Sequence, residues 1–243
     1  MRTPLWLPDD TGLSTTRNVG QWRALDAKKL VGADSKVWED VLTQFYFERL
    51  RSRYLDPIAA IQSHGSGRGE GFAIVAIQCS LIEFLESCHQ GRNYQSAKPQ
   101  GAFEYRSSSS IFVSFLTKRA PFNQEFSKTL AENFYRNVRC GILHEARTKG
   151  TWLIHEGESF DPIVNPTGPI LYRDRFQAGI DLFIANYRAA VPVDAKLQEA
   201  FIRKFDHLCV SQFDDAASRL PIVRRVVQSL AKLFSKARSH RPP

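Results

Sequence analysis

Apolar residues recur at helical spacing along most of the chain. Over residues 37–55 they return every three or four positions, and Asp34 or Ser35 stands before them as a helix cap. Pro57 is expected to break or kink this helix, which residues 58–62 continue. The same periodicity predicts further helices over residues 71–91, 107–119, 123–147, 175–191 and 196–210. Residues 1–33 lack such a pattern and are expected to be irregular.

Two short apolar runs, TWLIH at 151–155 and GPILY at 168–172, flank a loop rich in Pro, Gly and Asn. They predict the strands of a small hairpin. The glycines of residues 64–71 do not follow a strand, so they indicate a linker rather than a phosphate-binding loop. The predicted fold class is therefore mainly α, a helical bundle with a small β-hairpin insertion.

Three segments follow from these patterns. Residues 1–69 are expected to form an N-terminal segment and helix, residues 70–210 the helical bundle, and residues 211–243 a basic amphipathic C-terminal helix that begins at Pro221.

The composition is that of a globular protein, with 43% hydrophobic and 24% charged residues in 243. Four scattered cysteines without C-x-x-C spacing are typical of reduced thiols, so we expect a cytoplasmic protein with no metal site and no cofactor. The N-terminus has no apolar core of a secretory signal. The apolar run at 71–88 is interrupted by Gln78, Glu83 and Glu86, and we therefore expect no transmembrane segment.

The positive net charge belongs to the C-terminal segment. From Arg219 onward there are seven basic and no acidic side chains, which account for all but one unit of the net +8. Its apolar stripe could pack on the bundle or on a dimer partner, lie on an anionic membrane, or accompany basic contacts to RNA. These three interpretations remain open.

The helix over 123–147 carries an apolar repeat every four residues, from Phe126 to Ile142. At about 100° per residue, a polar ridge runs beside this repeat near the helix C-terminus. The ridge consists of Asn133, Arg136, Asn137, Cys140 and His144. Arg139 lies about 140° from His144 on the same wheel.

Histidine and arginine together could cleave RNA without a metal. Histidine is the side chain best suited to proton transfer near neutral pH, and arginine suits phosphate oxygens. The structural alternative is that His144 only complements the dipole at a helix C-terminus. Glu83 has two interpretations, a buried functional carboxylate or, more in keeping with the pattern, a residue on a solvated stripe. His155 could supply a second acid or base, although a position on a surface hairpin is the favoured interpretation. Tyr135 and Trp152 could stack bases, although a core position is the favoured interpretation for both.

The stretch FYRNVRCGILHEA, preceded by an apolar helix with an internal Glu and by a Ser-capped helix, resembles the HEPN superfamily of helical bundles. That family carries R-x4-6-H at the end of a core helix, and Arg139 and His144 fit R-x4-H. The resemblance covers roughly residues 70–190. Cys140 stands where the family often has a polar residue after the arginine. Arg136 and Asn137 form such an arginine–polar pair, but they lie too far from His144 for the family spacing. We expect them to assist Arg139 in the site.

The resemblance implies a metal-independent endoribonuclease, such as a toxin or an antiphage defence effector, with Arg139 and His144 as the catalytic pair. Its implied partners are RNA, a second copy in a homodimer, and a protein partner such as an antitoxin. The alternative is a noncatalytic helical interaction module or nucleotide-binding module, because the family also contains such members.

Overall fold

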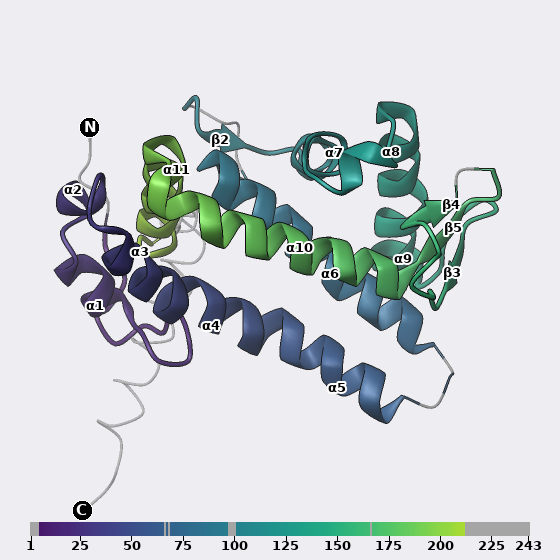
Figure 1. Ribbon diagram of the computed structural model, residues 1–243, viewed down its shortest axis with the longest axis horizontal. Helices are drawn as coiled ribbons and strands as arrows, with labels where there is room; N and C mark the ends of the chain where they lie inside the picture. The colour runs from purple at the N-terminus through teal and green to yellow at the C-terminus, as the bar shows by residue number, and fades with distance from the viewer. Residues whose placement is uncertain (1–4, 66, 68, 97–100, 166, 212–243) are drawn as a thin grey trace, which may run out of the picture. The chain divides into compact units, whose positions relative to one another are not determined.

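The computed structural model describes residues 5–65, 67, 69–96, 101–165 and 167–211 (Figure 1). Residues 8–209 form one compact unit, to which the description below applies. The predicted C-terminal helix and its basic residues lie outside the described residues.

The unit is mainly helical, which confirms the predicted fold class. Its first helices are α1 (Val19–Ala24), α2 (Ala27–Leu30), α3 (Ser35–Val41), η1 (Leu42–Phe47), α4 (Glu48–Leu50), η2 (Arg51–Leu55), α5 (Asp56–His64) and α6 (Glu70–Gln90). After strands β1 (Asn93–Tyr94) and β2 (Glu104–Tyr105) come α7 (Ser108–Lys118), η3 (Phe122–Gln124), α8 (Lys128–Phe134), η4 (Tyr135–Arg139) and α9 (Cys140–Glu145). Strands β3 (Leu153–His155), β4 (Val164–Asn165) and β5 (Ile170–Tyr172) precede α10 (Arg173–Ala190), η5 (Val191–Val193) and α11 (Ala195–Leu208).

The N-terminal segment is more regular than its sequence predicts. Asn18 caps α1 by accepting a hydrogen bond from the Gln21 amide, and the Gln21 side chain accepts one from the Asn18 amide in return. Such a reciprocal pair satisfies two backbone donors at a helix start. This local pairing allows a helix only six residues long.

The predicted break at Pro57 does not occur, because the helix runs without interruption from Ser35 to His64. Asp34 caps it through the Lys36 amide, as one of the two predicted residues. The turn over Arg51–Leu55 just before the proline is π-helical. A wider turn relieves the clash between a proline ring and the carbonyl four residues earlier.

Helix α6 is the element on which the others converge. It contacts α5, α7, α9, α10 and α11, and Figure 1 shows α10 crossing it. Because it has neighbours on several sides, its polar positions are buried along with its apolar ones. Gln78 and Glu86 are fully buried, and the side chain of Glu83 is only 17% exposed. The interpretation of Glu83 as part of a solvated stripe was therefore wrong.

The β insertion is a three-stranded sheet in the order β3, β5, β4. The two predicted strands are present, but β3 and β5 run parallel, with Leu153 opposite Ile170, so they do not form the expected hairpin. The antiparallel hairpin consists of β4 and β5. Strand β3 contacts α6, and β5 contacts α10.

The helix that carries the candidate site begins at Lys128, later than the predicted start near residue 123. Ser127 caps it by accepting from the Leu130 amide, while residues 122–124 form a separate 3-10 turn. The helix contains one π-helical turn, Tyr135–Arg139, and ends where Ala146 adopts a left-handed conformation. The Lys149 amide then donates to the Asn137 carbonyl, so the chain folds back along the helix.

Within the described residues, α6 is the one helix long and apolar enough to cross a membrane. Core helices of globular proteins pass the same test, and 56% of its apolar window is buried inside the fold. The described residues therefore contain no clear transmembrane segment.

The end of α6 depends on glycine at position 91. Its φ is +62°, and an added Cβ would lie 2.7 Å from the Ala200 Cα of α11. We predict that Gly91→Ala lowers the free energy of unfolding by more than ~2 kcal/mol, because the left-handed conformation alone costs an alanine ~1–2 kcal/mol and a backbone clash adds to it. Chemical denaturation followed by circular dichroism measures this.

Gly32 provides the matched control. Its φ is +77°, but nothing lies within 4 Å of an added Cβ. Gly32→Ala should therefore show the conformational cost alone. Equal destabilisation by the two substitutions would contradict the predicted contact between α6 and α11.

Candidate functional site

Arg139 points into the fold, towards α6. Its Nη2 donates to Glu83 Oε2 at 3.3 Å, and its guanidinium carbon lies 5.3 Å from the centre of the Tyr135 ring. The arginine side chain is 18% exposed. Glu83 also accepts a hydrogen bond from the Tyr105 hydroxyl. Arg139 thus belongs to a mostly buried polar chain that joins η4 to α6 and β2.

The surroundings of Arg139 shift its pKa and that of Tyr135. Burial disfavours the guanidinium, but attraction to Tyr135 and Glu83 outweighs this, so the pKa of Arg139 is raised. Burial also disfavours the charged form of the Tyr135 phenol and so raises its pKa, which the nearby Arg139 charge opposes. The Arg139 side chain is thus held inside the protein by Glu83 and Tyr135.

Arg136, Cys140 and His144 lie on the outer side of the same helix. Arg136 and His144 are exposed, and Cys140 is half-buried. The π turn inserts about one extra residue, so Arg136 and His144 are separated by about seven α-helical steps rather than eight, or about 20° around the axis. Arg139 precedes His144 by five residues of regular helix, about 140°. Three residues of the predicted ridge, Arg136, Cys140 and His144, thus stay on the outer side of the helix, while Arg139 points inward.

His144 is unengaged within the described part of the chain. It makes no hydrogen bond and no ion pair there, although it lies in the last turn of α9. A histidine charge is favourable at this end of a helix, where carbonyls have no partner within the helix. Both a catalytic and a purely helix-stabilising role are compatible with this position.

The Asn137 side chain belongs to a hydrogen-bonded chain with Asn133 and Trp152. Its amide donates to Asn133 Oδ1 at 2.9 Å, and the same oxygen accepts from the Trp152 indole at 2.6 Å. Trp152 is buried against Phe134, which agrees with its core interpretation. His155 is exposed on β3, with its ring 6.3 Å from that of Tyr172.

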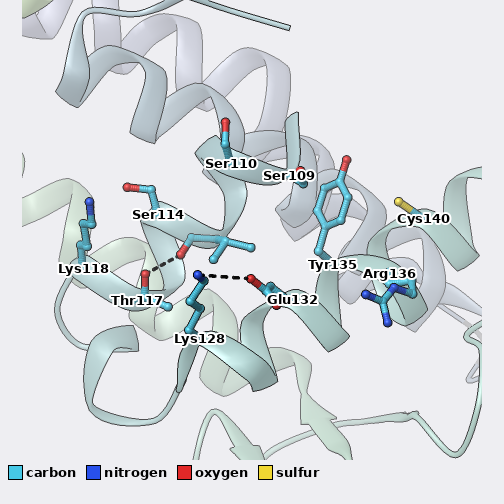
Figure 2. Close-up of a pocket in the computed structure, with 11 residues that line it drawn as sticks. Ser109, Ser110, Ser114, Thr117, Lys118, Lys128, Glu132, Tyr135, Arg136 and Cys140 are labelled. Atoms are coloured by element: carbon cyan, nitrogen blue, oxygen red, sulfur yellow. Dashed lines mark hydrogen bonds and ion pairs between the residues drawn. The ribbon is translucent and has the colours of Figure 1, made fainter. Parts of the chain in front are cut away.

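A surface groove of about 790 Å³ runs between α7 and the α8–η4 helix (Figure 2). We call it the α7–α8 groove. Arg136, Cys140 and Tyr135 line it from one side; Arg139, Asn137 and His144 do not. The remaining lining residues are Ser109, Ser110, Val113, Ser114, Thr117, Lys118, Lys128 and Glu132. Since Cys140 lines the groove and His144 follows it by one helical turn, the ridge continues from the groove to His144.

The sequence analysis did not single out the α7 residues that line the groove, although their spacing in the sequence indicates a polar helix face. Ser110, Ser114 and Thr117 recur at spacings of four and three, which places them on one face of a helix. Between them, Ile111, Phe112, Phe115 and Leu116 are fully buried on the other face. A serine run that continues as a polar helical stripe thus indicates a surface face as well as a cap.

A second ion pair holds the groove wall to the core. Glu86 of α6 is fully buried and accepts from Arg119 Nε at 2.8 Å and from Ser114 Oγ at 2.8 Å. Arg119 follows α7 directly, and Ser114 lies within it. This carboxylate therefore fixes the position of α7 relative to α6.

The described residues contain no cluster of three or more His, Cys, Asp or Glu side chains that could hold a metal ion. Cys79 and Cys88 are buried as free thiols, and burial is the main cause of their raised pKa, to about 12 for Cys88. The groove and the ridge carry cations, hydroxyls, the Glu132 carboxylate, the Cys140 thiol and one histidine.

Searches against protein-family models, curated proteins and solved structures found no match to this chain. The interpretation of the site consequently depends on its own geometry.

The two arginines should respond differently to truncation. Arg139→Ala leaves Glu83 mostly buried without its cation, so we predict that the free energy of unfolding falls by ~1–3 kcal/mol. Arg136→Ala removes an exposed side chain with no partner among the described residues and should leave stability unchanged. Thermal and chemical denaturation of both variants test this, and equal stability of the two would contradict an anchoring role for Arg139.

Proposed function

We propose that this protein is a metal-independent endoribonuclease of the HEPN type, with His144 as its proton-transfer group. The observation that carries the proposal is that His144 is exposed, without a partner among the described residues, at the end of a ridge that continues from a polar groove. A histidine in this position is available to exchange a proton with a phosphodiester.

The reaction uses groups that RNA itself supplies. The ribose 2′-oxygen attacks the adjacent phosphorus, and the bond from phosphorus to the 5′-oxygen breaks, leaving a 2′,3′-cyclic phosphate and a free 5′-hydroxyl. His144 would take the 2′-hydroxyl proton or protonate the departing oxygen. Two copies of His144 could act as separate base and acid, so we propose a homodimer in which each copy contributes its His144.

Arg136 is the arginine that we assign to the phosphate. It is exposed, lines the groove and lies about 20° from His144 around the helix axis. Its guanidinium would stabilise the charge that develops on the pentacoordinate phosphorus. Arg139, the arginine of the R-x4-H spacing, would act as a positioning residue that holds η4 to α6 through Glu83.

We predict that the full chain cleaves single-stranded RNA in excess EDTA and that His144→Ala lowers the cleavage rate by at least ~100-fold, the usual effect of losing a general acid or base. Gel electrophoresis of labelled RNA measures the rate. His155→Ala is the matched control, because His155 is also exposed but lies on β3 and not on the helix that carries the ridge. Unchanged cleavage by the His144→Ala variant would remove His144 from the mechanism, and cleavage by no form of the protein would reject the enzyme.

The alternative is a noncatalytic interaction module, and one observation favours it. Arg139 is committed to Glu83 rather than to a phosphate, so the family spacing does not by itself provide an available arginine. In that case the folded chain leaves RNA intact in EDTA, and substitution of His144 changes only the stability of α9.

A further inference from the structure

Cations without partners lie at both ends of the α7–α8 groove. Lys118 is at one end and Arg136 at the other, with Lys128 between them (Figure 2). Lys118 and Arg136 are exposed and make no ion pair within the described residues. Lys128 is paired with Glu132 at 3.9 Å, but both side chains are largely exposed, so this pair is weak. The groove therefore carries an excess of positive charge along its length.

The hydroxyl groups of α7 are hydrogen-bond acceptors towards the groove. Ser110 and Thr117 donate to the backbone carbonyls of Ser107 and Val113. Ser114 donates to Glu86 and accepts from Gln90 Nε2, which leaves its oxygen one lone pair. Their hydrogens are thus committed to the protein, whereas their oxygens keep lone pairs. Such oxygens suit a ligand that brings its own hydroxyl donors, and a ribose 2′-hydroxyl is one.

The groove also has an apolar surface for a base. Val113 and the ring of Tyr135 belong to its lining, and Tyr135 stands beside Ser109 in Figure 2. Phe112 contacts the Tyr135 ring edge-to-face at 5.3 Å and Arg139 lies against it, so the ring is held in place. A rigid aromatic ring can stack an unpaired base, which a duplex does not offer.

We propose that the α7–α8 groove binds the segment of single-stranded RNA next to the cleaved bond and selects ribose over deoxyribose. Lys118, Lys128 and Arg136 contact phosphates, the α7 hydroxyl oxygens accept from 2′-hydroxyls, and Tyr135 stacks a base. This inference rests on the proposed function for the position of the cleaved bond, which His144 determines. It adds the residues that set substrate preference.

The test measures RNA binding separately from cleavage. The full chain carrying His144→Ala is titrated onto fluorescein-labelled single-stranded RNA of about a dozen nucleotides, and the dissociation constant is obtained from anisotropy at several salt concentrations. Lys118→Glu in this background should raise the dissociation constant about tenfold and reduce the salt dependence by about one phosphate contact. The control is Lys36→Glu, the same charge change at an exposed position in the first turn of α3.

Two further ligands test the selectivity. Single-stranded DNA of the same sequence and the corresponding RNA duplex should each bind more weakly than single-stranded RNA. The inference is overturned if Lys118→Glu binds like its parent, if Lys36→Glu weakens binding equally, or if DNA and duplex bind as tightly as the single strand. Binding that depends on Lys118, in a protein whose unsubstituted form does not cleave RNA in EDTA, would reject the nuclease while retaining the groove.

Discussion

Glu83 and Glu86 place two carboxylates on α6, a helix surrounded by the rest of the bundle, and each is matched by an arginine from another element. Glu86 pairs with Arg119 after α7, and Glu83 pairs with Arg139 at the end of η4. Leaving a fully buried charge such as Glu86 without its partner typically costs ~3–5 kcal/mol. The partly exposed Glu83 is expected to cost ~1–3 kcal/mol, so both pairs favour one arrangement of these helices. The positions of α7 and α9 on α6 depend on this matching of charges.

The two ion pairs also determine which side chains face the solvent on η4, α9 and α7. Since Arg139 is drawn inward by Glu83, the outer side of its helix is left to Arg136, Cys140 and His144. The π turn between Phe134 and Cys140 allows both orientations, because it changes the rotation of the helix without ending it. Glu86 in turn holds the serine-bearing face of α7 opposite, and the groove lies between the two helices.

The sequence predicted much of the fold, since the periodicity of long helices and the cap Asp34 are local signals. It did not predict the π turn just before Pro57. Nor did it predict the parallel pairing of β3 with β5, which depends on contacts distant in sequence. A uniform helical wheel grouped Arg136, Cys140 and His144 correctly on one side. It could not show that Arg139 has a carboxylate partner, because Glu83 lies 56 residues earlier in the chain.

The central claim is that the ridge ending at His144 cleaves RNA through the 2′-hydroxyl of its substrate, without a metal. The most direct measurement compares, in excess EDTA, an RNA cleaved at one defined position with the same RNA carrying a single 2′-deoxy nucleotide there. The account predicts that this one substitution abolishes cleavage at that bond and that the unmodified RNA yields a 2′,3′-cyclic phosphate, identified by mass spectrometry. Cleavage of the 2′-deoxy position at an undiminished rate, or a product ending in a 3′-hydroxyl, would contradict it.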